Sequence, residues 1–134
     1  FAIYAVIVVV VFLLGLVPMW LTARNRAKER DAARRELRLS EMENDLSAAV
    51  INARRAEYEP ARQATSKFFT SLRAQCDVWS ESSDLTRAQC EALRPSLDQR
   101  DELITLLARS DPASADRLTA IYVAHDKAMS VPSP

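Results

Sequence analysis

The sequence contains a single glycine, Gly15, and a single histidine, His125, among its 134 residues. Loops that cradle phosphate groups need several glycines, so phosphate-loop chemistry is excluded. The G-x-S-x-G and H-E-x-x-H motifs of hydrolases and metalloproteases are also absent. We therefore expect a chain that is not an enzyme and that binds no cofactor, no metal and no small-molecule substrate.

Charged residues are missing from the first 21 residues, Phe1–Leu21. As a helix this apolar run would reach about 31 Å, the thickness of one hydrocarbon core. Tyr4 and Trp20 lie near its two ends, where aromatic side chains suit the headgroup level, and Arg24 and Arg26 follow at once. These residues predict a membrane-spanning helix with Tyr4, Trp20, Arg24 and Arg26 at the membrane interface.

A secretory signal peptide is the alternative interpretation of this run. Its apolar part would be shorter, and a small-x-small cleavage site would follow. Ala23 has Leu21 two residues before it, which makes a poor cleavage site. We therefore expect a retained anchor over residues 1–22.

The formal net charge is zero, but the charges are unevenly distributed. Residues 22–40 carry seven Lys or Arg against three acids, and the rest of the chain is mildly acidic. Such a chain is not a nucleic-acid binder. Basic residues next to a span favour the cytoplasmic side, so we expect a single-pass protein of a bacterial inner (plasma) membrane, in contact with lipid, with its C-terminal part in the cytoplasm. The periplasmic side is the alternative.

A long helical stalk is predicted for residues 23–59. Arg24–Glu59 has neither glycine nor proline, and Pro60 would end or kink the helix. Six residues of its second half form a short heptad seam. This seam either contacts a partner helix, as a short coiled coil, or packs against the chain's own domain; its members are Leu39, Met42, Leu46, Ala49, Ala53 and Ala56.

Residues 60–130 predict a small head of antiparallel helices, which makes the chain all-α. We expect its helices to be separated by a turn at Ser80–Asp84 and by proline boundaries, and to be followed by a disordered tail at residues 131–134. The expected helices are Ala61–Trp79, Leu85–Leu93, Pro95–Arg109 and Pro112–Met129. Asp111-Pro112 is a typical helix start, an N-cap oxygen followed by proline. A wide apolar stripe on the first head helix predicts the core: Ala61, Thr65, Phe68, Phe69, Leu72, Cys76 and Trp79.

Two polar features of the head could carry chemistry, and a structural role is expected for both. His125 lies on the apolar face of the last helix with Tyr122 and Met129, as a packed and hydrogen-bonded core histidine would. Asp98, Asp101 and Glu102 share a helix face as cation ligands can, but arginines lie nearby and no calcium loop is present. We expect a solvated charged face there.

The two cysteines, Cys76 and Cys90, are equally distant from Ser83 in the predicted turn. An antiparallel helix pair would bring them opposite each other. In an oxidising compartment they would form a disulfide worth about 3 kcal/mol, and in a reducing one they would be small core residues. The sequence leaves both alternatives open.

These features predict a protein that holds helices at a membrane. The first hypothesis is a non-catalytic, single-pass accessory or assembly subunit that binds other subunits of a larger membrane complex, for example a respiratory or photosynthetic one. The alternative is a membrane-tethered adaptor or regulator that recruits soluble partners through the seam.

Overall fold

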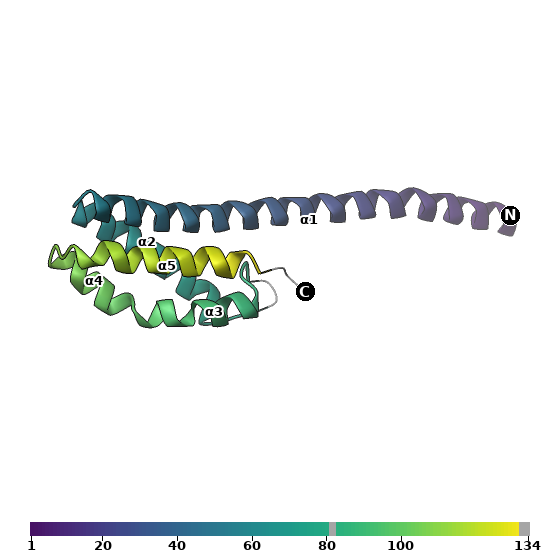
Figure 1. The fold of residues 1–134 in the computed structure, drawn as a ribbon. Coiled ribbons are helices and arrows are strands. Elements are labelled where there is room, and N and C mark those ends of the chain that lie inside the picture. The colour runs from purple at the N-terminus through teal and green to yellow at the C-terminus, as the bar shows by residue number, and fades with distance from the viewer. Residues whose placement is uncertain (81–82, 132–134) are drawn as a thin grey trace. The chain divides into compact units, whose positions relative to one another are not determined.

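The computed structural model describes residues 1–80 and 83–131, and within these residues every regular element is a helix (Figure 1). The chain is therefore all-α, as the sequence predicted. Glu81 and Ser82 of the predicted turn and residues 132–134 of the predicted tail lie outside the described residues. The helices are α1 (Ala2–Arg54), α2 (Tyr58–Cys76), α3 (Arg87–Asp98), α4 (Arg100–Ala108) and α5 (Ala113–Met129).

Two compact units divide the chain, an N-terminal unit of residues 1–37 and a C-terminal unit of residues 38–134. Helix α1 contributes to both of them. The second half of the predicted stalk, residues 38–54, is thus part of the C-terminal unit.

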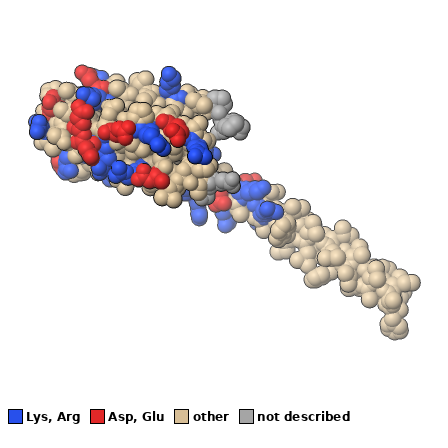
Figure 2. Space-filling view, turned by 90° about the horizontal axis from the view of Figure 1, so that it is seen from below, with Lys and Arg blue, Asp and Glu red and all other residues tan. Residues whose placement is uncertain are grey.

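The N-terminal unit contains the apolar run, which is helical and long enough to cross a membrane. Its large apolar side chains from Ile3 to Leu21 are between 48% and 77% exposed. Pro18 lies inside the helix, and the Thr22 hydroxyl donates a hydrogen bond of 2.8 Å to its carbonyl oxygen. Charged side chains begin only after this run (Figure 2).

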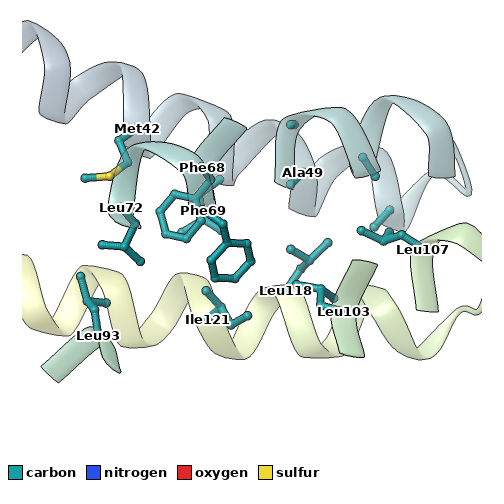
Figure 3. Packing of buried hydrophobic residues seen from close by; sticks show 14 of the residues in the cluster. Met42, Ala49, Phe68, Phe69, Leu72, Leu93, Leu103, Leu107, Leu118 and Ile121 are labelled. Atoms are coloured by element: carbon teal, nitrogen blue, oxygen red, sulfur yellow. The ribbon is translucent and has the colours of Figure 1, made fainter. Parts of the chain in front are cut away.

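The core of the C-terminal unit surrounds Phe68 and Phe69 of α2, whose side chains are fully buried (Figure 3). Their ring centroids are 5.2 Å apart in an edge-to-face arrangement, which aromatic pairs prefer. Buried side chains from every helix join the same cluster, among them Leu46, Leu72, Leu93, Leu103, Leu107, Leu118 and Ile121. The apolar stripe of α2 was correctly predicted as far as Leu72; Cys76 is half-buried, and Trp79 follows the end of the helix.

The heptad seam of α1 belongs to this core. Met42, Leu46, Ala49 and Ala53 are buried, and Leu39 packs against the cluster from its edge. Ala56, the last predicted member, is exposed beyond the end of α1. The structure therefore has the seam packed against the chain's own domain, which is one of the two alternatives that the sequence left open.

The end of α1 differs from the prediction, because Pro60 does not terminate it. The helix ends at Arg54, and Pro60 lies in the first turn of α2, where a missing N–H costs no hydrogen bond. The turn between the helices is a Schellman-type ending. The Glu57 N–H bonds the Asn52 carbonyl at 2.8 Å, the Ala56 N–H bonds the Ala53 carbonyl at 3.1 Å, and Ala56 has a φ of 60°.

The same ending recurs after α4, with Ser110 at a φ of 54°. The Asp111 N–H bonds the Leu106 carbonyl at 3.0 Å, and the Ser110 N–H bonds the Leu107 carbonyl at 3.1 Å. The predicted start of the last helix is nearly correct, since α5 begins at Ala113, whose N–H bonds Asp111 Oδ1 at 2.9 Å.

The predicted helix boundary at Pro95 is wrong. Pro95 lies inside α3, and the break between α3 and α4 falls at Gln99. The carbonyl that Pro95 leaves without an N–H belongs to Glu91, an exposed residue that water can reach. The helix therefore continues through the proline.

Both Schellman-type turns place a non-glycine residue in the left-handed region, which costs roughly 1–2 kcal/mol. We predict that Ala56→Gly raises the free energy of unfolding by about 1 kcal/mol, because glycine adopts this conformation without strain. Chemical denaturation of the full chain in detergent, followed by circular dichroism, measures the change. As the matched control, Ala92→Gly on the exposed face of α3 should lower stability by about 1 kcal/mol. A loss of stability in Ala56→Gly would contradict the turn described here.

Candidate functional site

The predicted membrane interface contains one side-chain contact between its members. The Arg24 guanidinium lies 5.2 Å from the centroid of the Trp20 ring, one helical turn earlier in α1. Tyr4, near the other end of the run, is 76% exposed. A cation stacked on an indole places a charge and an amphipathic ring at the same level, an arrangement suited to lipid headgroups.

A second cluster joins α1 to the residues that precede α3, and sequence reasoning missed it. The Asp84 carboxylate is buried and accepts two hydrogen bonds from Arg38, from Nε at 2.6 Å and from an Nη atom at 2.7 Å. The Gln75 side chain completes the cluster. Its Nε2 donates to Asp84 Oδ2 at 3.1 Å, and its Oε1 accepts from the Asp84 N–H at 2.8 Å. We call Arg38, Gln75 and Asp84 the Asp84 latch.

The latch carries a buried charge that depends on its partners. A two-pronged contact from a guanidinium is the strongest common pairing for a carboxylate. Loss of Arg38 would leave the buried Asp84 carboxylate poorly solvated, which is more costly than the loss of a surface pair, whereas the Arg38 side chain is itself 51% exposed. Arg38 and Asp84 are 46 positions apart in sequence, so no local pattern announces the pair.

Neighbouring contacts hold the chain on both sides of Asp84. The Trp79 Nε1 donates to the Leu85 carbonyl at 3.0 Å, and the Arg87 guanidinium lies 5.9 Å from the Trp79 ring centroid. Thr86 begins α3 with a capping box, in which its hydroxyl accepts from the Gln89 N–H while Gln89 Oε1 accepts from the Thr86 N–H. These contacts fix the entry to α3.

The two cysteines lie beside the latch and are joined by a disulfide bond. Cys76 is the last residue of α2, Cys90 lies in the first turn of α3, and their Cα atoms are 5.5 Å apart. Cys90 is buried, whereas Cys76 is half-buried. The bond therefore ties α2 to α3 across the residues that contain Asp84.

His125 is buried in the core, in edge-to-face contact with Phe68 at a centroid distance of 5.7 Å. The expectation of a hydrogen-bonded histidine is wrong for one ring atom, because Nε2 faces no hydrogen-bond partner in the described part of the chain. Burial lowers the pKa of His125, and Glu43 and Asp126 oppose this shift only in part. A neutral imidazole in edge-to-face contact with an aromatic ring is suited to packing.

This burial predicts a specific loss of stability in acid. Because the folded-state pKa of His125 is below its usual 6.5, the unfolded chain takes up the proton first as the pH falls. Stability should be fully present above about pH 6.5 and should fall by up to about 1.4 kcal/mol per pH unit below it. Denaturation of the full chain between pH 7.5 and 5 checks this, with His125→Gln as the variant in which that component of the slope disappears. An identical slope in both proteins would exclude His125 as its source.

The acidic residues Asp98, Asp101 and Glu102 do not converge on a site. Glu102 pairs with Arg117 at 2.9 Å, Asp101 pairs with Arg100 at 3.0 Å, and all three acidic residues are exposed. No group of three potential metal ligands occurs among the residues that the structure describes.

No protein-family model matches the chain, and neither a curated protein nor a solved structure is significantly similar to it. The features of the chain that bear on its function are the exposed apolar run, the buried core and the Asp84 latch.

Proposed function

We propose that the chain is a non-catalytic, single-pass accessory or assembly subunit of a larger membrane complex, with a respiratory or photosynthetic complex as the expected host. The observation that carries the proposal is the exposure of every large apolar side chain from Ile3 to Leu21. An uncharged helix of this length, with nothing from its own unit packed on it, needs lipid or the spans of other subunits around it.

The C-terminal unit supports a role in packing. Its single histidine is enclosed in the core beside Phe68, and its cysteines are joined to each other. Acidic and basic side chains are interspersed over the face seen in Figure 2, so this surface carries charges of both signs. Such a surface fits contacts with neighbouring subunits better than attraction of a strongly charged ligand.

The adaptor alternative required the heptad seam of α1 to be accessible to a partner helix, and most of this seam is buried. Four of the six seam residues, Met42, Leu46, Ala49 and Ala53, lie in the core of the C-terminal unit. A partner helix could reach them only if α1 separated from α2, which would expose the phenylalanines as well. The accessory-subunit function requires no such opening.

For the location, we propose a bacterial plasma membrane with the C-terminal unit on the cytoplasmic side. Six Lys or Arg lie within residues 22–37, close to the span, and the positive-inside rule favours retention of such residues in the cytoplasm. The disulfide favours the opposite side when it is taken as a permanent bond, because permanent disulfides persist in oxidising compartments. A bond that is made and broken in the cytoplasm satisfies both observations.

Purification in mild detergent tests the accessory-subunit proposal. The tagged full chain should resist extraction by alkaline carbonate, and it should elute at a fixed ratio with the same set of proteins after repeated washing. Mass spectrometry of the eluate identifies this set. Extraction into carbonate, or elution of the chain alone, would contradict the proposal.

Substitutions show whether packing of the C-terminal unit is what the host requires. Phe68→Ala leaves a cavity in the core and should cost about 3–5 kcal/mol, so this variant should be lost from the complex or degraded. Val123→Ala, at an exposed position on α5, and His125→Gln should both remain assembled. Assembly of Phe68→Ala together with loss of function in an assembled His125→Gln would indicate an active site at the histidine.

A further inference from the structure

The disulfide borders a cavity, and one of its two cysteines is only half-buried there. The cavity has a volume of about 270 Å³ and lies between the end of α2 and helix α3. Cys76 is half-buried there, whereas Cys90 is buried, so a reagent would reach Cys76 first. The other lining residues are Arg73, Asp77, Arg94, Leu97 and Asp98.

Two guanidinium groups line the same cavity as the sulfurs. Arg73 is held by Asp77 at 3.2 Å, and Arg94 by Glu91 at 3.6 Å, so both remain near the helix surface. Asp77 and Asp98 line the cavity as well, so its acidic and basic residues are balanced. Exchange at this disulfide therefore depends on the partial exposure of Cys76 at the cavity, and not on a local excess of positive charge.

The disulfide is linked to the Asp84 latch through a single residue. Gln75 precedes Cys76 in α2, and its side chain makes the two hydrogen bonds that hold Asp84. Asp84 in turn binds Arg38, the first residue of the C-terminal unit in α1. The bond between Cys76 and Cys90 thus closes the stretch of chain that contains Asp84.

We propose that Cys76 and Cys90 form a thiol–disulfide switch. Oxidation of the pair stabilises the contact between Asp84 of the latch and Arg38 of α1. With the pair reduced, only non-covalent contacts hold Asp84 and Trp79 in place. With the pair bridged, the chain around Asp84 has less conformational freedom even when Asp84 and Arg38 are apart. Formation of their contact then costs less conformational entropy. The switch rests on the cytoplasmic placement proposed above, where a disulfide is characteristically transient or redox-sensing.

The exchange needs only a small-molecule disulfide, such as oxidised glutathione, as the co-reactant. The Cys76 thiolate attacks one of its sulfurs, so a mixed disulfide forms and one thiolate leaves. The Cys90 thiolate then attacks the Cys76 sulfur, which forms the protein disulfide and releases the second thiolate. The two protons from the protein thiols end on the released thiolates, so that two thiols are produced for each disulfide formed.

Trp79 reports the state of the latch in solution. In the full chain with Trp20→Phe, Trp79 is the only tryptophan, and it is 38% exposed in the bridged form. We expect acrylamide quenching of its fluorescence to rise roughly twofold when excess reduced glutathione opens the disulfide, and to return when oxidised glutathione is added. Equal quenching in the two redox states would overturn the switch.

Substitution of two aspartates distinguishes loss of the Asp84 latch from a general destabilisation of the C-terminal unit. Asp84→Asn removes the charge that Arg38 binds, so quenching should be high even when the pair is bridged. Asp101→Asn, the matched change at an exposed carboxylate on α4 away from the cavity, should behave like the parent protein in both states. Quenching that is unchanged in Asp84→Asn would show that the disulfide does not act through the latch.

Alkylation of cysteines in cells tests the switch and the cytoplasmic location of the C-terminal unit separately. In untreated cells quenched with acid and a permeant maleimide, the pair should be reduced, and it should be bridged after treatment with a thiol oxidant. An impermeant maleimide should not label intact cells before or after reductant. A pair that is bridged in untreated cells and labelled from outside after reduction would overturn the placement together with the switch. A pair that stays reduced after oxidant, and unlabelled from outside, would overturn the switch alone.

Discussion

Burial of Phe68 and Phe69 is the interaction on which the C-terminal unit depends. Adjacent residues on a helix point in different directions, so two buried phenylalanines require apolar neighbours on two sides of α2. Burying each side chain contributes about 1.5–3 kcal/mol, a large share of the stability of a small domain. Met42 and Ala49 of α1 and Ile121 and Leu118 of α5 surround them in the core (Figure 3).

This requirement gives α1 two roles along one helix. Up to Leu21 its apolar side chains are exposed, as a membrane requires, whereas from Met42 to Ala53 one face is buried against the chain's own helices. The change occurs near Arg38, the residue that the buried Asp84 carboxylate holds. The Arg38–Asp84 pair therefore marks the position on α1 where the folded C-terminal unit begins. The proposed disulfide switch would stabilise or weaken this pair, and so it would act at that position.

Helical periodicity made the architecture predictable. The absence of charge in the first 21 residues, the stripe through Phe68 and Leu72, and the apolar face of α5 each follow from a local pattern, and the structure has these features. Proline boundaries were less predictable, because proline suits the first turn of a helix as well as its end. Pro60 lies in the first turn of α2, and Pro95 is accommodated within α3.

Contacts distant in sequence could not be read from the chain. Arg38 appeared as one of several basic residues near the span, and Asp84 as a turn residue, so their pairing came only from the fold. The left-handed turns at Ala56 and Ser110 were hidden for a different reason, because the residue that usually marks such turns, glycine, is absent from both. The heptad seam was visible, but its spacing is the same for a partner helix and for the chain's own core.

Residues 42–53 of α1 fold as part of the C-terminal unit, whereas residues 24–36 do not. Hydrogen exchange of the full chain in detergent, read by mass spectrometry, distinguishes the two segments. Amides of residues 42–53 should exchange as slowly as those of residues 68–72, and both sets should become faster together in a core variant. Fast exchange of residues 42–53, at the rate of residues 24–36 and with α2 still protected, would show that this part of α1 is not packed in the core of the C-terminal unit.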